Sequence, residues 1–143
     1  MPTVHRTALL SYPAKAMYDL VNDIESYPQF LPWCRETKVY SRTDSSIEAS
    51  MEIAKGAIHK TFRTRNTLIP FQRIEMRLVE GPFKHLDGIW QFESLGDSAC
   101  KVSLNLEFEF SNALMQLAMG AVFNQIANTL LDAFCQRARQ LYG

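Results

Sequence analysis

The feature that most constrains this chain is a run without any charged side chain, from Phe110 to Leu131. As a helix, a run of this length would be long enough to cross a lipid bilayer. Polar residues interrupt it, and a membrane span would leave their side chains without hydrogen-bond partners. These residues are Ser111, Asn112, Gln116, Asn124, Gln125, Asn128 and Thr129. The run therefore predicts a helix packed within a globular domain.

Asn112 can cap this helix, which we expect to continue toward the end of the chain. From Phe123 onward apolar residues recur at helical spacing on one face, and the opposite face is polar. The apolar face comprises Ile126, Ala127, Leu130, Leu131, Phe134, Ala138 and Leu141. This half of the helix is expected to pack on a sheet.

The first half of the same helix is apolar on every side between Leu114 and Phe123, apart from Gln116. Such a helix is expected to be buried on every side. If one side lies on the sheet, the other must meet a partner, an entrance loop or a ligand in a cavity, with ordinary core packing as the alternative. Met115 and Met119 are adaptable side chains that suit an irregular cavity wall. The cavity interpretation predicts a hollow beneath these two methionines.

Strand periodicity dominates the middle of the chain. Between Cys100 and Phe110 apolar and polar residues alternate, as in an antiparallel strand with one face in water. Alternation and turn signals predict five preceding strands at 37–42, 47–53, 58–69, 74–78 and 83–95. The connections between these six strands are short enough to require hairpins, so the strands form a meander. A first strand is expected at 4–10, and Pro13 and Asp23 favour the starts of two short helices after it.

This order of elements predicts an α+β protein with the helix-grip fold. In that fold a curved antiparallel sheet, here of seven strands, wraps around a long C-terminal helix and leaves an apolar cavity between them. Two short helices separate the first and second strands. We expect a single domain over residues 1–143, because the glycines and prolines fall singly and no linker or repeat interrupts the chain.

Composition limits the function classes. The 15 basic residues are matched by 15 acidic ones, so the chain lacks the basic bias of a DNA-binding protein, and we expect no DNA partner. Cys34, Cys100 and Cys135 are widely spaced and indicate neither a disulfide framework nor a zinc site. The first residues lack an apolar stretch of signal-peptide length. We expect a cytoplasmic protein that is a monomer or a weak dimer.

Three segments resemble a known family: VNDIESYPQFLPWC (21–34), FRTRNTL (62–68) and GPFKHLDGIWQFE (81–93). Together they are similar to the coenzyme-Q-binding START-domain proteins, also described as polyketide cyclase or dehydrase-like, and the similarity extends over residues 3–142. The resemblance implies the START/Bet v 1-like form of the helix-grip fold. It also implies a cavity that holds a polyprenyl quinone such as ubiquinone, in support of respiratory electron transport, with no other cofactor required.

Two other functions follow from the same resemblance. Within the family the chain most resembles the bacterial ribosome-association toxins, which implies binding to the large ribosomal subunit and a block of subunit joining. The cyclase description implies an enzyme, although a fold alone does not establish chemistry.

Our leading hypothesis is a non-catalytic protein that binds a hydrophobic small molecule, either a quinone or a comparable lipid. Its expected cavity walls are Trp33, Phe62, Phe83, Trp90, Phe92, Met115, Met119 and Phe123. Thr64 and Asn66 would meet the polar end of the ligand, because polar side chains among aromatics on an inward strand face require partners. Alternatively they bond each other or a water, or point outward through a bulge. Gly88 could mark that bulge or a close approach of ligand to the backbone.

The segment around two prolines displays Tyr27, Phe30 and Leu31, and we expect these side chains to cover the cavity mouth. Trp33, whose indole NH needs a partner when buried, is a candidate to orient a quinone carbonyl. The alternative is a helix corner packed on the core, above all for Phe30.

The opposite face of the strand that carries Thr64 and Asn66 presents His59, Arg63 and Arg65. Such a basic stripe could bind ribosomal RNA, phosphate or the anionic head groups of a membrane surface. A solvated face paired with nearby glutamates is the alternative. We expect no catalytic residues and no metal site, because the three histidines lie on different strands and no nucleophile or carboxylate pair is spaced to match them.

Overall fold

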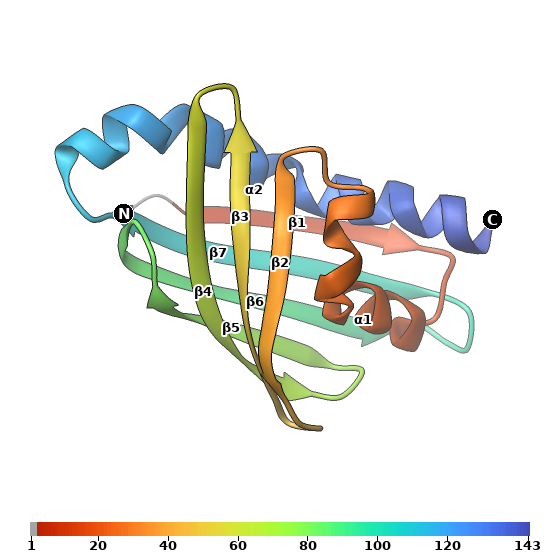
Figure 1. The fold of residues 1–143 in the computed structure, drawn as a ribbon. Coiled ribbons are helices and arrows are strands. Elements are labelled where there is room, and N and C mark those ends of the chain that lie inside the picture. Colours follow the sequence, from red (N-terminus) through yellow and green to blue (C-terminus); the bar gives the residue numbers. More distant parts are fainter. Residues whose placement is uncertain (1–2) are drawn as a thin grey trace.

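The computed structural model describes residues 3–143 and contains a seven-stranded antiparallel sheet that curves around one long helix (Figure 1). The elements are β1 (Thr3–Leu10), α1 (Ala14–Asn22), the 3₁₀ helix η1 (Ile24–Gln29), β2 (Cys34–Arg42), β3 (Ser46–Lys55), β4 (Ile58–Ile69), β5 (Arg73–Glu80), β6 (Phe83–Ser94), β7 (Cys100–Phe110) and α2 (Ala113–Tyr142). The predicted α+β helix-grip architecture is confirmed. All seven predicted strands are present, and β2 begins three residues earlier than expected, at Cys34.

The strands lie in the order β1-β7-β6-β5-β4-β3-β2, so the six meander strands are neighbours in chain order and β1 joins beyond β7. Each neighbouring pair is antiparallel. Along β7 the apolar side chains are buried and the intervening polar ones are more exposed. The alternation in the sequence therefore fixes which face of the sheet turns toward α2.

The long helix α2 lies against the concave face of the sheet, and α1 and η1 lie near its C-terminal half (Figure 1). Apolar side chains form two clusters. The first joins α1, η1 and the C-terminal half of α2 to the sheet, with Phe134 completely buried. The second lies beneath the first half of α2, where Met119 is completely buried.

The long helix and the 3₁₀ helix begin where the sequence predicts, but only one of the two expected capping side chains bonds a backbone N–H. The side chain of Asn112 accepts a hydrogen bond of 2.8 Å from the backbone N–H of Met115 and so caps α2 as expected. Asp23 stands at the start of η1, but its carboxylate accepts a hydrogen bond from the hydroxyl of Ser26 instead of from a backbone N–H.

The expectation that the first half of α2 is buried on every side is wrong. Leu114 is 74% exposed and Leu117 is 84% exposed, whereas Met119 is fully buried and Met115 is partly buried. The sheet covers one side of these turns, and no other described residue covers the leucine side. An apolar surface all around a helix was therefore an unreliable sign of burial here.

Candidate functional site

A cavity of about 90 Å³ lies between the concave face of the sheet and α2. Strands β3 to β7, η1 and the middle of α2 contribute its walls, so residues far apart in the sequence converge on one space. Its lining includes Tyr27, Trp33, Met51, Phe62, Thr64, Asn66, Met76, Trp90, Phe123, Ile126, Ala127, Leu130 and Phe134. Most of these side chains are apolar, which suits an apolar occupant.

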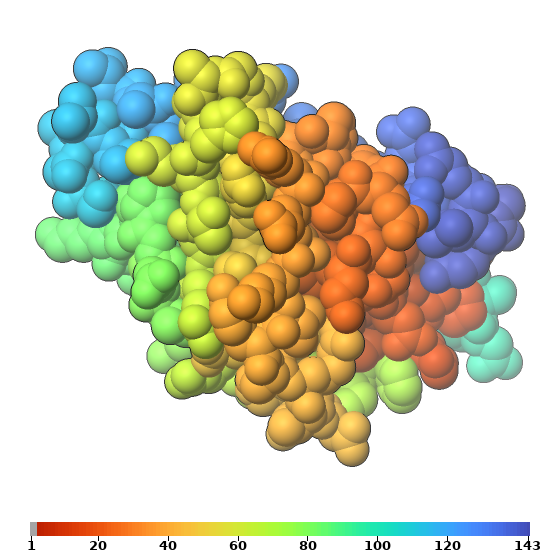
Figure 2. All heavy atoms as spheres, viewed as in Figure 1, coloured from red at the N-terminus to blue at the C-terminus, as the bar shows by residue number. Residues whose placement is uncertain are grey.

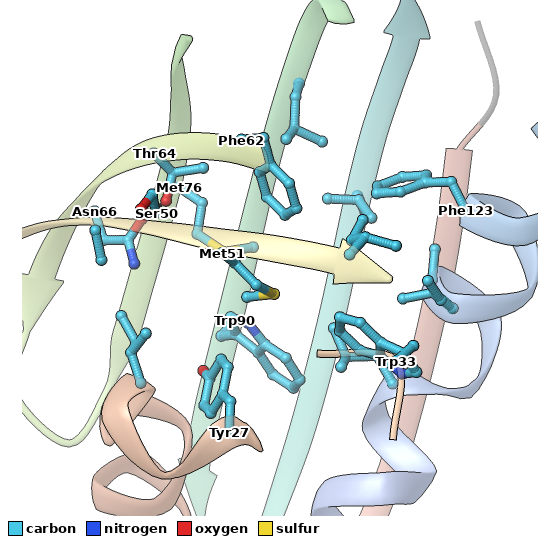
Figure 3. A pocket seen from close by; sticks show the side chains of 18 of the residues that line it. Tyr27, Trp33, Ser50, Met51, Phe62, Thr64, Asn66, Met76, Trp90 and Phe123 are labelled. Carbon is cyan, nitrogen blue, oxygen red and sulfur yellow. Dashed lines mark hydrogen bonds between the residues drawn. The ribbon is translucent and has the colours of Figure 1, made fainter. Parts of the chain in front are cut away.

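The cavity has two chemically different ends (Figure 3). Thr64 and Asn66 lie at one end, beside Ser50. Trp33 and Phe123 lie at the other, where the segment before β2 approaches α2. A ligand with one polar end and an apolar body matches this division.

The polar end is built from neighbours on one face of β4. The hydroxyl of Thr64 donates a hydrogen bond of 3.0 Å to Oδ1 of Asn66, and both residues are buried. The sequence left open whether these two side chains would bond each other, and they do. The amide nitrogen of Asn66 forms no hydrogen bond with another described residue, so it is a donor that a ligand carbonyl could accept from.

The two tryptophans add further donors, since the indole NH of neither Trp33 nor Trp90 donates to another described residue. Trp90 is buried and Trp33 partly buried, and both line the cavity. The hydroxyl of Tyr27 is already engaged, because it donates to the backbone carbonyl of Val21. Burial raises the pKa of Tyr27 far above its ordinary value, so this phenol stays neutral.

Met51 and Met76, both partly buried, are the methionines that line the cavity. Gly88 makes room for one of them, because a Cβ at this position would lie 2.5 Å from Cε of Met76 and 3.0 Å from a methyl of Leu106. The pairing of β6 with its neighbours stays in register at Gly88. Gly88 therefore marks no bulge, and the close approach to the backbone there is by a protein side chain. The pairing of β4 with β5 does shift register between Arg63 and Thr64, but Thr64 and Asn66 line the cavity and do not point outward.

Four expected wall residues do not line the cavity. Phe83 stacks on Phe110 with ring centroids 5.1 Å apart, and Phe92 packs edge-on against Tyr18. Met115 and Met119 belong to the cluster beneath the start of α2, where aromatic side chains fill the space. The expected hollow beneath these two methionines is thus misplaced. It lies further along the helix, beneath the stretch from Phe123 to Phe134.

The residues expected at the cavity mouth have different positions. Tyr27 lines the cavity, whereas Leu31 is fully buried and does not. Phe30 is partly buried and packs edge-on against Phe134, with ring centroids 5.4 Å apart, and the guanidinium of Arg137 lies 5.2 Å from the centre of its ring. Leu31 and Phe30 therefore form the packed helix corner that was the alternative.

The basic stripe lies on the convex face of the sheet, away from the cavity, and is largely ion-paired. Glu48 is buried, and its Oε1 accepts from Nε and Nη2 of Arg65 at 3.0 and 2.6 Å. Its Oε2 pairs with Arg63, whose guanidinium also lies 3.6 Å from the ring centre of Tyr40. Hydrogen bonds from Arg65 and Arg63 hold the pKa of Glu48 below its usual value. His59 lies 3.4 Å from a carboxylate oxygen of Glu52. Binding of RNA or anionic lipid by this stripe stays a prediction.

Other reactive side chains lie outside the cavity lining. His5 bonds Asn105, and His85 lies 3.2 Å from a carboxylate oxygen of Asp87. Burial raises the pKa of Cys34 to about 11, so this thiol stays protonated at neutral pH. Within residues 3–143 no cluster of three or more potential metal ligands is present. In the same range, none of the helices is both long enough and apolar enough to cross a membrane.

Comparisons with known proteins agree with the fold. A sequence profile described as polyketide cyclase / dehydrase and lipid transport matches residues 10–135. The ribosome association toxin RatA of Pseudomonas aeruginosa is 50% identical to this chain over 98% of the chain and 97% of that protein. The mitochondrial coenzyme Q-binding protein COQ10 homolog B of Xenopus laevis is 26% identical over 94% of this chain and 57% of that protein.

Among solved structures, the Zhui aromatase/cyclase of Streptomyces sp. R1128 superposes with a TM-score of 0.84 at 17% identity, over 97% of this chain and 94% of that one. At that identity the likeness concerns the fold alone.

Proposed function

This chain belongs to the polyketide cyclase / dehydrase and lipid transport family, and from that premise we propose that it binds a hydrophobic ligand in the cavity beneath α2 without transforming it. The observation that carries the proposal is an apolar cavity with unengaged donors at defined places: the amide of Asn66 and the indoles of Trp33 and Trp90. The three histidines lie outside its lining, which supports a binding role over catalysis.

The ligand we propose is a polyprenyl quinone such as ubiquinone, or a lipid of similar chemistry. A quinone ring offers carbonyl acceptors to the donors of the cavity, and its isoprenoid tail matches the apolar walls. The name of the Xenopus relative, a coenzyme Q-binding protein, supports this choice. The cavity of about 90 Å³ is smaller than a dry protein cavity of roughly 150 Å³, which binds benzene, so side chains of the wall have to move to admit a quinone ring; Met51 and Met76 are flexible enough to do so.

Intrinsic fluorescence tests the proposal directly, because both tryptophans of the chain line the cavity. Titration with a short-tailed ubiquinone should quench their emission in a saturable manner. Ala127→Leu places three extra carbons in the cavity wall and should abolish quenching. Ala121→Leu changes an exposed position of the same helix and should leave it unchanged. Equal quenching of both variants would exclude the cavity as the binding site.

Extraction of the purified native protein with organic solvent, followed by mass spectrometry, tests the identity of the ligand. A stoichiometric quinone supports the proposal. If a different lipid is recovered in stoichiometric amount, the cavity binds a hydrophobic ligand as proposed, but that ligand is not a quinone.

As a second candidate we propose that the protein acts in the cytoplasm by binding the large ribosomal subunit and opposing subunit joining. The support is the ribosome association toxin of Pseudomonas aeruginosa, which matches nearly the whole chain at 50% identity. The surface we assign to this contact is the basic stripe with Arg63 and Arg65. Glu48 orients both guanidinium groups there while reducing the net field available to RNA.

Cosedimentation with purified large subunits in sucrose gradients, at increasing salt, tests this role. Arg63→Ala combined with Arg65→Ala should weaken binding and reduce its dependence on salt. Lys15→Ala combined with Arg139→Ala is the control, because it removes the same charge from exposed positions on α1 and α2, away from this face of the sheet. Binding that survives the first pair of changes would rule out the basic stripe, and binding absent from the wild-type protein would rule out the role.

A further inference from the structure

The start of α2 carries an exposed apolar surface that neither the cavity nor the basic stripe explains. Leu114 and Leu117 are 74% and 84% exposed, and because they are three positions apart they share one side of the helix. Ala113, Ala118 and Ala121 around them are also exposed. In Figure 2 this light-blue segment is a prominence at one end of the molecule, between the β3–β4 and β5–β6 hairpins. We call these five residues the helix tip.

Exposed lysines surround the helix tip. Lys60 projects from the face of β4 that also carries Ile58 and Phe62, and both of those side chains pack in the cluster with Met115 and Met119. Phe62 also packs edge-on against Phe123, so Lys60 lies beside the turn of α2 that directly follows the helix tip.

A second lysine lies on the other hairpin. Lys84 follows Phe83, which stacks on Phe110 just before the helix, and the carbonyl of Pro82 accepts from the N–H of Ser111. On the β3–β4 hairpin, Lys55 donates a hydrogen bond of 3.0 Å to Gln125 of the helix itself.

Acidic side chains are fewer around this surface. The acids near Lys84 are Glu80, which is exposed at the end of β5, and Glu109, which is partly exposed near the end of β7 opposite His85; against them stand the three lysines. Within α2 the first charged residue is Asp132, more than three turns beyond Leu117. The helix tip is thus an apolar surface inside a net basic rim.

We propose that the helix tip docks on the surface of an anionic lipid bilayer, with Leu114 and Leu117 inserted below the head groups and Lys60, Lys84 and Lys55 facing the lipid phosphates. An apolar surface with a basic rim is the pattern of segments that lie in the membrane interface. RNA fits less well, because the side chains of the two exposed leucines carry neither a positive charge nor a hydrogen-bond donor for phosphate oxygens. A second copy of the chain also fits less well, because a two-fold pairing of tips would bring the lysines of both copies together. The inference goes beyond the proposed ligand binding and does not require an occupied cavity.

Vesicle cosedimentation tests the proposal with the full chain. Binding to vesicles of phosphatidylglycerol and phosphatidylcholine should exceed binding to phosphatidylcholine alone and should decrease with salt. Leu114→Gln combined with Leu117→Gln should weaken it by roughly tenfold or more, because two apolar side chains no longer enter the bilayer. Lys60→Gln combined with Lys84→Gln should lower binding to the anionic vesicles and leave binding to the neutral ones unchanged.

Leu141→Gln is a matched control, since this leucine is 49% exposed near the other end of the same helix. It should bind vesicles like the wild type, and circular dichroism should be the same for all variants. The proposal is overturned if the double leucine variant binds as the wild type does, or if no vesicle is bound. It is also overturned if light scattering shows that the wild type is a dimer and that the double leucine variant is a monomer. The same holds if the double leucine variant loses binding to ribosomal RNA and keeps binding to vesicles. The fluorescence titration measures ligand binding in the cavity separately, so a failure of membrane docking is distinguishable from a failure of ligand binding.

Discussion

The hydrogen bond between Thr64 and Asn66 allows a sharp test of how the polar end of the cavity is held together. Both side chains are buried, and the donor of one satisfies the acceptor of the other at 3.0 Å. Thr64→Val keeps the shape of the side chain but removes this donor, which leaves Oδ1 of Asn66 unpaired. Asn66→Leu removes the acceptor and leaves the hydroxyl of Thr64 unpaired.

Each single substitution should lower the free energy of unfolding by about 1–3 kcal/mol, the cost of leaving a buried polar group unsatisfied. The combination of both substitutions leaves no unpaired partner and extends the apolar wall. It should therefore cost much less than the sum of the two single changes, with a coupling energy of about 1–3 kcal/mol. In a chain of this size each kcal/mol corresponds to a change in Tm of roughly 2–4 °C.

Urea unfolding of the wild type, both single variants and the double variant gives the complete cycle. Single effects that add to within about 0.5 kcal/mol would refute the reasoning, because they would mean that the two groups do not depend on each other. The same proteins separate structure from binding. If the amide of Asn66 contacts a quinone carbonyl, the double variant should retain stability but bind the quinone more weakly in the fluorescence titration.

Three further predictions concern stability and reactivity. Phe134→Ala should lower the free energy of unfolding by about 3–5 kcal/mol in urea, because this fully buried ring lies at the centre of the aromatic cluster; a loss below about 1 kcal/mol would contradict that position. Glu48→Gln should lower Tm at pH 7, and the difference from the wild type should shrink as pH falls below about 4.5. The folded-state pKa of Glu48 is depressed by Arg65 and Arg63, so its contribution is present above the ordinary pKa of 4.5 and is lost on protonation. A difference that does not depend on pH would refute this. Cys34, whose pKa is raised to about 11, should react with iodoacetamide at pH 8 far more slowly in the folded protein than in urea, as peptide mass spectrometry can measure; equal rates would contradict its burial.

Local patterns in the chain were sufficient to predict the meander from β2 to β7 and the terminal helix, whereas the pairing of β1 with β7 joins distant segments. The alternation from Cys100 to Phe110 defines a strand with one buried face, and the short turns between strands leave a meander as the only arrangement. Asn112 marks the start of the terminal helix, and the apolar face after Phe123 specifies which side meets the sheet. Each of these signals lies within a few residues and depends little on the rest of the chain.

The position of the cavity could not be predicted from such local patterns. Inward orientation could be read from alternation for Phe83 and Phe62 alike, yet Phe83 is packed against Phe110 and Phe123 while Phe62 borders the cavity. Whether a space is filled depends on side chains that meet from several distant segments, and periodicity along one segment contains no such information.

The same limit applies to the surface. Arg65 faces Glu48 because the register of β3 against β4 sets these residues opposite each other, and this register is a property of two strands together. Leu114 and Leu117 are exposed because no second layer of residues 3–143 covers their side of α2. A hydrophobic pattern indicates that a side chain favours burial, but only the assembled structure determines whether a covering surface exists.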